Sequence, residues 1–486
     1  MARLETVDPA TATAGIERSI QHATCLKLVG YPDRAGVAGT RLIPEAAIRH
    51  PRVSRDGRTY EFVVRDGLRF SNGESVSARS FERALVRVGA PKLFSPGRRW
   101  IREVEGASAL AAGRATRLSG VRARGNRLTI RLVEPVADFA TRLSMSFFCA
   151  IPRQLWGELE WPGSDNVPLP SAGPYFVESW RRGWTLVLKR NPYYRGPRLR
   201  RLHAIVFELR GSSATSGVER TERNELDWAG YIPPASHAEL AARYGVNRGR
   251  YRVHPSGQLR YIALHLASPF ADPGLRRAVN AALDRAALAA SHGPHAVTPT
   301  EQFLTASLPG YRNVNAQSLR PDPNARRFGD GRGARVYLRC EELNPADCVE
   351  RSRRVQRDLS AVGLDVVPVL GIVDPSCPRP GFHMSFETRP ALAAGSVDFL
   401  RWLFEFERWE TCSTQFAPPA RLRRHERLRG AARLRAVERF DADLARSSTW
   451  VIPYGVDNHR EFFSSRVGCV TFHPIYGLDL ATLCLR

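Results

Sequence analysis

The residue types and spacings that usually carry catalysis are missing from this chain of 486 residues. It contains no GxSxG nucleophile motif, HExxH metal motif, GxxxxGK[ST] phosphate loop or GxGxxG dinucleotide pattern. Its 12 histidines are scattered, and the glycine-rich run 329–333 is typical of a loop. Because no nucleophile, base and orienting group can be assembled, the sequence predicts a protein that is not an enzyme and needs no cofactor.

Eight cysteines offer a second kind of chemistry, because thiolates bind metal ions and thiols form disulfides. No CxxC motif occurs and no histidine stands at zinc-ligand spacing, so no metal site is expected. Two close pairs are predicted to be disulfides with Cα atoms about 5.5 Å apart: Cys340 with Cys348, and Cys469 with Cys484. The alternative is a set of buried free thiols, as in an intracellular protein. No pairing is predicted for the other four, Cys25, Cys149, Cys377 and Cys412.

The formal net charge of +24 raises the question of a nucleic-acid partner, since Lys and Arg neutralise phosphates. Lysines occur only at positions 27, 92 and 189, and the arginines are distributed from Arg3 to Arg486 rather than gathered in one block. Acidic residues interrupt even the basic stretch 421–446. A solvated surface therefore explains the charge better than a nucleic-acid ligand.

The elements that must position any site follow from turn and cap residues. The turn signals around Gly57, Gly67 and Gly73 bracket a strand-like alternation over 59–65, and Ser77 can cap a helix after it. Alternation returns around residues 128–132 and 184–188. These patterns predict a hairpin region followed by a helix and further strands.

A helix is predicted to begin at Pro273, because Asp272 is a good N-cap and an apolar stripe follows. A second helix should end before Gly363 and lead into a strand over 364–369. A third helical stretch is predicted over 421–446. Helices that lead directly into strands indicate an α/β fold.

Several blocks of the chain form a recognisable series. The most specific is the stretch 51–77 (PRVSRDGRTYEFVVRDGLRFSNGESVS). The others are LETVDP at 4–9, SAGPY at 171–175, LKRNPYY at 188–194, NELDW at 224–228, FADPGLRRAVN at 270–280, IPYG at 452–455 and SSRVG at 464–468. In this order, the blocks resemble the signature segments of the family 5 extracellular solute-binding proteins of ABC transporters, the oligopeptide and dipeptide class.

The resemblance implies an α/β, two-lobed periplasmic-binding-protein-like fold with a two-stranded hinge and an extra subdomain in the N-terminal lobe. The hinge strands are expected near 252–266 and 449–456, and the lobes would close over a ligand. The expected segments are 1–45 for the start of lobe I, 46–168 for the family-specific subdomain, 169–255 for the continuation of lobe I, 256–448 for lobe II and 449–486 for the return to lobe I.

The resemblance also identifies candidate ligand-binding residues. The segment 397–402 is similar to the family's strand that enters the cleft and continues into a W-x-x-D-x-x-D-P loop. Counted from Trp402, Glu405 replaces the first Asp, Arg408 occupies the second and Trp409 replaces Pro. Glu407 or Glu410 would restore an acid if the register were shifted by one or two residues. The alternative is that the two tryptophans are core aromatics.

A further candidate is His265, which stands where the family often has Asn, although a core histidine is the competing interpretation. In peptide-binding members an acid in the loop pairs with the peptide's amino terminus, so Arg408 argues against ordinary peptide capture. A guanidinium offers only donors and a fixed positive charge, which favours a ligand with a carboxylate or phosphate. The indoles of Trp402 and Trp409 would stack on its apolar or sugar-like parts.

The function implied is the extracytoplasmic substrate-binding component of an ABC importer, a monomer that captures peptides or a related small polar solute and partners with membrane permease subunits. The alternative is an intracellular ligand sensor, the two-lobed domain of a transcriptional or signalling regulator. The start at Met1 has no leader, which is expected to have been removed or lost to a misassigned start codon. The strand that family members carry before the LETVDP segment is also expected to be missing, which would leave a sheet edge exposed.

Overall fold

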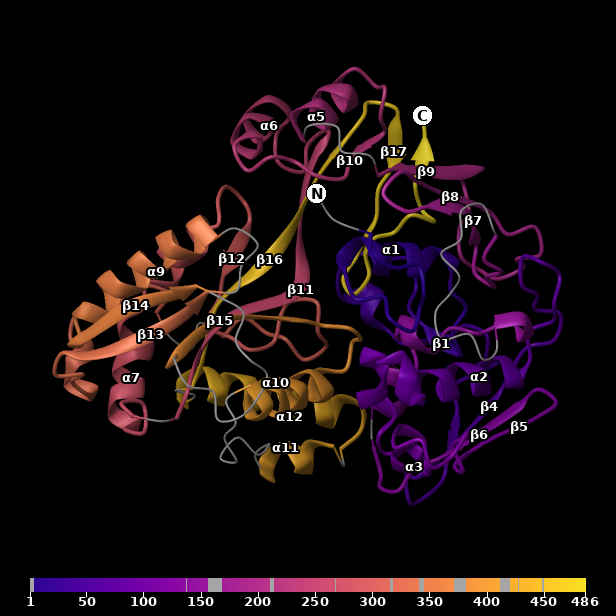
Figure 1. Cartoon of the computed structure of the whole chain (residues 1–486), viewed down its shortest axis with the longest axis horizontal. Coiled ribbons are helices and arrows are strands. Elements are labelled where there is room, and N and C mark those ends of the chain that lie inside the picture. The colour runs from indigo at the N-terminus through magenta and orange to yellow at the C-terminus, as the bar shows by residue number, and fades with distance from the viewer. Residues whose placement is uncertain are drawn as a thin grey trace. The chain divides into compact units, whose positions relative to one another are not determined.

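The computed structural model describes residues 4–136, 138–155, 168–209, 214–266, 268–314, 318–340, 345–370, 382–410, 420–426, 428–447 and 450–486. The chain forms two compact units. Unit 1 comprises Met1–Pro233, Leu392–Gly395 and Glu461–Arg486, and unit 2 comprises Pro234–Ala391 and Ser396–Arg460. Both units contain helices and strands, which confirms the α/β class (Figure 1). The five-segment domain division remains a prediction.

Unit 1 is built from short helices and several small sheets. Its helices are α1 (Gly15–Thr24), α2 (Ala78–Gly89), α3 (Ala107–Ala111), α4 (Phe139–Arg142) and α5 (Ala214–Glu222). Its strands are β1 (Val29–Gly30), β2 (Ile43–Pro44), β3 (Arg52–Val53), β4 (Thr59–Val63), β5 (Val121–Arg124), β6 (Arg127–Arg131), β7 (Tyr175–Arg181), β8 (Thr185–Arg190), β9 (Ala204–Glu208), β10 (Trp228–Ala229), β17 (Val467–Cys469), β18 (Phe472–His473), β19 (Gly477–Leu478) and β20 (Cys484–Leu485). Short 3₁₀ helices in this unit are η1 (Val37–Thr40), η2 (Pro91–Leu93), η3 (Pro96–Ile101), η4 (Ser146–Phe148) and η5 (Arg153–Leu155).

The predicted hairpin region forms an antiparallel sheet in the order β3-β4-β6-β5. Gly57, Gly67, Gly73 and Gly125 all have positive φ, a conformation that glycine adopts without strain, so the turn prediction is confirmed. Inward residues such as Phe62 alternate with outward ones along β4. α2 begins after Ser77 as expected and packs against β5 and β6, so one face of this sheet is buried.

The other core of unit 1 joins distant parts of the chain. Ile20 of α1, Leu186 of β8 and Leu480 of the C-terminal segment belong to one buried apolar cluster. β7, β8 and β9 form the sheet beneath it. The short segment Leu392–Gly395 also belongs to unit 1, where the Ala394 N–H donates to Tyr31 Oη at 2.8 Å.

Unit 2 is organised around one mixed sheet with the order β16-β11-β15-β13-β14, and β12 pairs with β16. Its strands are β11 (Tyr251–Leu264), β12 (Val297–Pro299), β13 (Ala334–Cys340), β14 (Leu364–Leu370), β15 (Met384–Pro390) and β16 (Val451–Phe463), the last of which continues into unit 1 and pairs there with β10. Its helices are α6 (Ser236–Tyr244), α7 (Pro273–Ala282), α8 (Arg285–Ala290), α9 (Pro345–Ser360), α10 (Ser396–Glu410), α11 (Ala420–His425) and α12 (Gly430–Ser447), with one 3₁₀ helix, η6 (Ala325–Phe328).

Helices α7, α8 and α9 pack their apolar residues against one face of this sheet, where Ile262, Leu338 and Met384 are fully buried. The Asp272 carboxylate accepts from the Gly274 N–H at 2.8 Å, which confirms the predicted cap of α7. β14 follows α9 and pairs in parallel with β13, as the helix-to-strand pattern indicated. β11 and β16, which include the expected hinge strands, are neighbours in the sheet.

Two secondary-structure predictions need correction. The segment 397–402, expected to be a strand, lies in α10. A helix places residues three and four apart on one face, so the alternation assumed for a strand does not apply. The stretch 421–446 is not one helix, because it divides between α11 and α12 and Gly430 has a positive φ.

Three disulfides join the six cysteines that the structure describes. Cys340–Cys348 and Cys469–Cys484 have Cα separations of 5.8 and 5.0 Å, which confirms both predicted pairs. The third bond, Cys25–Cys149, spans 124 positions and was not predicted. Cys377 and Cys412 lie outside the described residues.

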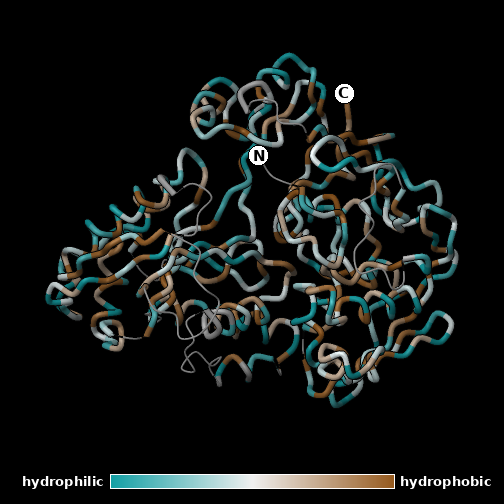
Figure 2. Tube along the Cα trace, in the orientation of Figure 1, coloured by the Kyte–Doolittle hydropathy of each residue, from teal (hydrophilic) through white to brown (hydrophobic). Residues whose placement is uncertain are grey.

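Figure 2 shows hydrophobic and hydrophilic residues interspersed in short runs along the trace of both units. In the described part of the chain, no helix has both the length and the apolar character needed to cross a membrane.

Candidate functional site

The residues expected to bind ligand fall on unit 2, most of them on α10. Trp402 is half-buried, and the Arg389 guanidinium of β15 lies 5.9 Å from the centroid of its ring. A guanidinium at that distance from an indole face contributes an attractive cation–π interaction. Trp402 is therefore packed against the sheet by a charged residue of β15.

Glu405 lies one helical turn after Trp402 and is engaged by its own helix. Arg401 Nε donates to Glu405 Oε1 at 3.1 Å, and Arg401 Nη1 lies 3.3 Å from Glu426 Oε1. Glu405, the predicted replacement for the family's first Asp, is thus one of two carboxylates that interact with Arg401.

The remaining members of the predicted loop are only partly described. Positions 407, 408 and 409 have helical backbone within α10, but the side chains of Glu407, Arg408 and Trp409 lie outside the described residues.

Beneath Trp402 runs a buried group of charged residues that sequence reasoning missed. Arg339 Nη2 donates to Glu387 Oε1 at 2.6 Å, and Arg389 Nη2 lies 3.8 Å from the other carboxylate oxygen. All three side chains are less than a tenth exposed. We call Arg339, Glu387 and Arg389, together with Phe382, the polar seam.

Strand register explains why the seam lies on one face. Arg339 of β13 is the partner of Ser385, and Ser385, Glu387 and Arg389 alternate along β15. Side chains two residues apart share a face of a sheet. The seam therefore lies on the face opposite the apolar core that contains Met384. A polar residue at every second position of this segment is the signal that could have found it.

His265 reaches the same seam from the end of β11. Its N–H donates to the His383 carbonyl at 2.9 Å, and its ring packs edge-on against Phe382 at 4.5 Å. The Arg339 guanidinium lies 4.6 Å from the same Phe382 ring. The structure thus connects His265 and Trp402, two of the predicted site residues, through the contacts of the polar seam.

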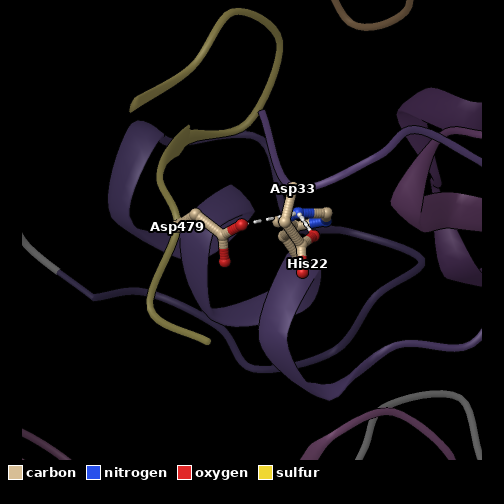
Figure 3. A group of neighbouring side chains, drawn as sticks. All are labelled: His22, Asp33 and Asp479. Carbon is tan, nitrogen blue, oxygen red and sulfur yellow. Dashed lines mark ion pairs between the residues drawn. The ribbon is translucent and has the colours of Figure 1, made fainter. Parts of the chain in front are cut away.

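A second buried polar group lies in unit 1 and was not predicted. Figure 3 shows three of its members, His22 of α1, Asp33 after β1 and Asp479 after β19. The fourth is Arg198, before β9, and we call the group the His22 cluster. His22 Nε2 lies 3.3 Å from Asp33 Oδ1 and 3.6 Å from Asp479 Oδ2. Arg198 Nε donates to Asp33 Oδ1 at 2.8 Å, and its Nη2 lies 3.5 Å from Asp479 Oδ1.

The electrostatics of the His22 cluster favour the ionised form of Asp33. Burial opposes ionisation of Asp33, but Arg198 and His22 outweigh it and lower the pKa of Asp33 below its usual range. Burial likewise opposes the charge of Arg198, whereas Asp33, Asp479 and Glu45 raise its pKa. Tyr476 stacks on the His22 ring at 4.2 Å and closes the cluster.

The His22 cluster has the residue types of a metal site, since one ligand atom from each of His22, Asp33 and Asp479 lies within 4.8 Å of the others. Arg198, however, already places a fixed positive charge against both carboxylates. A divalent cation bound there would lie beside the Arg198 guanidinium, and the two positive charges would repel each other. The arrangement fits an ion-pair network that fastens α1 to the C-terminal segment.

Solved structures with the same architecture are matched over the full length. The chain superposes on "Clavulanic acid biosynthesis oligopeptide binding protein 2" with a TM-score of 0.86 and 20% identity, over 100% of this chain and 94% of that one. It therefore has the two-lobed α/β fold of periplasmic binding proteins, as the sequence predicted.

Residues 41–327, more than half of the chain, match the family model described as "Bacterial extracellular solute-binding proteins, family 5 Middle". The protein belongs to this family of solute-binding proteins.

Curated relatives carry names that indicate different ligands. The "Oligopeptide-binding protein OppA" of Bacillus subtilis (strain 168) is 25% identical over 241 residues, 48% of this chain and 43% of that protein. The "Probable deoxycholate-binding periplasmic protein YgiS" of Escherichia coli (strain K12) is 27% identical over 244 residues, 48% of this chain and 44% of that protein. The matched region covers less than half the length of either relative.

Proposed function

We propose that this chain is the substrate-binding component of an ABC importer. It acts outside the cytoplasm as a monomer, captures a peptide or a related small polar solute without transforming it, and delivers it to membrane permease subunits. The observation that carries this proposal is the full-length correspondence with the binding-protein fold, together with family membership. Binding that differs between an open and a closed state is what this fold supplies to a transporter.

The disulfides support an extracytoplasmic location over the alternative of an intracellular sensor. Structural disulfides persist in oxidising compartments and are rare in the cytosol. All six described cysteines are paired, including Cys25 with Cys149. A regulator working in the cytosol would lose these cross-links to the reducing pool.

For the ligand-binding residues we propose Trp402, Glu405, Glu407, Arg408, Trp409 and His265. The contact between Arg389 and Trp402 supports this set, because it holds the indole in one orientation. The edge-on packing of His265 against Phe382 supports it at the other end of the polar seam. Arg408 then selects a ligand with a carboxylate, a phosphate or another strong acceptor.

The test is calorimetric titration of the intact protein with neutral peptides, acidic peptides and small anionic solutes. We expect the anionic compounds to bind most tightly, and Arg408→Ala to weaken the best of them by about 1.5–3 kcal/mol, the scale of a hydrogen bond to a charged group. Arg435→Ala, at an exposed position of α12, is the matched control and should leave affinity unchanged.

Each outcome of this titration has a separate meaning. Tight binding of neutral peptides, with no effect of Arg408→Ala, contradicts the proposed ligand chemistry but leaves the transport role standing. Failure of every peptide and small polar solute to bind contradicts the proposed function itself.

A further inference from the structure

The outer face of the β3-β4-β6-β5 sheet in unit 1 collects arginines that are widely separated in the sequence. Arg52 of β3, Arg122 and Arg124 of β5, and Arg127 and Arg131 of β6 are all exposed. We call these five residues the arginine face. The linear sequence disperses them between positions 52 and 131, and only the antiparallel pairing of four strands brings them together.

Strand register shows that the five side chains share one face. Arg52 pairs with Glu61, Glu61 with Thr129, and Thr129 with Arg122. In the next outward row, Arg127 pairs with Arg124. Directly paired residues point to the same side of an antiparallel sheet, and residues two positions apart do so as well. The opposite side is the buried one, where Phe62, Leu128 and Ile130 pack.

Few carboxylates balance this charge. Glu61 lies 3.5 Å from Arg127, and Glu105 lies 3.7 Å from Arg131. Among the described residues, no carboxylate forms an ion pair with Arg52, Arg122 or Arg124. Three guanidiniums of the arginine face are therefore exposed without a carboxylate partner among the described residues.

The arginine face is not simply what an arginine-rich chain produces everywhere. The β7-β8-β9 sheet of the same unit pairs Lys189 with Glu178, and Arg220 of α5 binds Glu208 of β9 at 2.9 Å. Val206 of β9 is 61% exposed on that sheet. The two sheets differ in their surface charge, so the concentration of arginine is a property of the first sheet.

We propose that the arginine face binds an anionic phospholipid surface. The outward residues of these strands are Arg, Thr, Glu and Val, so the face offers neither the aromatic platforms that stack single-stranded bases nor the aromatic anchors typical of protein interfaces. An exposed sheet face with several guanidiniums that lack carboxylate partners among the described residues fits a surface rich in phosphate groups, to which each basic residue is attracted within a Debye length. The proposal does not depend on which solute the protein carries.

The experiment measures co-sedimentation of the intact protein with vesicles of phosphatidylcholine, with and without an equal part of phosphatidylglycerol. One triple variant removes charge from the arginine face: Arg52→Gln, Arg122→Gln and Arg124→Gln. A matched variant removes the same charge from exposed positions of α11 and α12: Arg424→Gln, Arg435→Gln and Arg439→Gln. Because each basic residue at an anionic surface strengthens binding about fivefold, the first variant should bind about 100-fold more weakly than wild type.

We expect the matched variant to bind phosphatidylglycerol vesicles as tightly as the wild type. Neither of these two proteins should bind vesicles of phosphatidylcholine alone. Added salt should release the wild type from the anionic vesicles. An equal loss in both triple variants would overturn the proposal, because binding would then follow total charge. The proposal would also be overturned if the wild type did not bind phosphatidylglycerol vesicles, even if the same protein bound duplex DNA. The circular dichroism melting curve of each variant verifies that a loss does not come from unfolding.

Discussion

Glu387 is the carboxylate that joins the two arginines of the polar seam. It accepts from Arg339 at 2.6 Å and lies 3.8 Å from Arg389, whose guanidinium in turn faces Trp402. Removing one member of a buried ion pair leaves an uncompensated charge, which costs more than an exposed pair ever contributes. The position of Trp402 therefore depends on a carboxylate that touches it only through Arg389.

The substitution Glu387→Gln should lower the free energy of unfolding by about 3–5 kcal/mol, because it removes a negative charge that lies beside two buried guanidiniums. Glu239→Gln is the matched control, since Glu239 forms an exposed pair with Arg243 in the same unit and should cost less than about 1 kcal/mol. Urea unfolding monitored by tryptophan fluorescence measures both. Equal midpoints for the two variants would mean that the seam contributes no stability.

At the scale of single elements, the buried carboxylate of Asp441 helps to fix α12 to the loop that follows β12. Asp441 accepts from the Phe303 and Leu304 N–H groups at 3.0 Å each and from Gln302 Nε2 at 2.8 Å. Burial raises the pKa of Asp441 to about 6, although these hydrogen bonds oppose the rise. The folded protein therefore holds this proton at pH values where the unfolded chain has already released it.

A raised carboxyl pKa gives stability that is complete below the unfolded pKa of about 4 and is lost as the pH rises through about 6. Between pH 4 and pH 6 the wild type should thus lose stability relative to Asp441→Asn, which has no proton to release. Asp443→Asn, on the exposed side of the same helix, should keep the wild-type pH dependence. The measurement is the midpoint of urea unfolding at pH 4, 5, 6 and 7. The prediction is contradicted if the midpoints of wild type and Asp441→Asn change with pH in the same way.

Elements differ in how far the sequence could predict them. The turns of the stretch 51–77 can be predicted from the sequence, because glycines mark positions where the backbone has a positive φ. The segment 397–402 resembles a strand of the family but lies in α10, because six residues are too few for their pattern to distinguish a strand from a helix. The polar seam was missed because it depends on the pairing of β13 with β15, which is set by the whole sheet.

On the scale of the whole molecule, the cross-links differ most in the length of chain that they close. Cys25–Cys149 spans 124 positions, against 8 for Cys340–Cys348 and 15 for Cys469–Cys484. In the chain-entropy account, a longer closed loop removes more freedom from the unfolded state. The bond that the sequence did not reveal should therefore stabilise the protein most.

We expect Cys25→Ala with Cys149→Ala to lower the unfolding free energy by about 4–5 kcal/mol, and Cys469→Ala with Cys484→Ala by about 3 kcal/mol. Thermal and urea unfolding of the two double variants compare them directly under non-reducing conditions. The reverse order would show that loop length does not govern the stability contributed by these bonds.

The division of unit 1 among three stretches of chain has a consequence for synthesis. Its last stretch, Glu461–Arg486, carries Asp479 of the His22 cluster and Leu480 of the apolar core. A ribosome that has made the first 460 residues has therefore made all of unit 2 but cannot yet complete unit 1. Unit 2 can therefore fold before unit 1, which has to wait until residues 461–486 have been made. The unit whose first residues are made earliest is thus the last to complete its core.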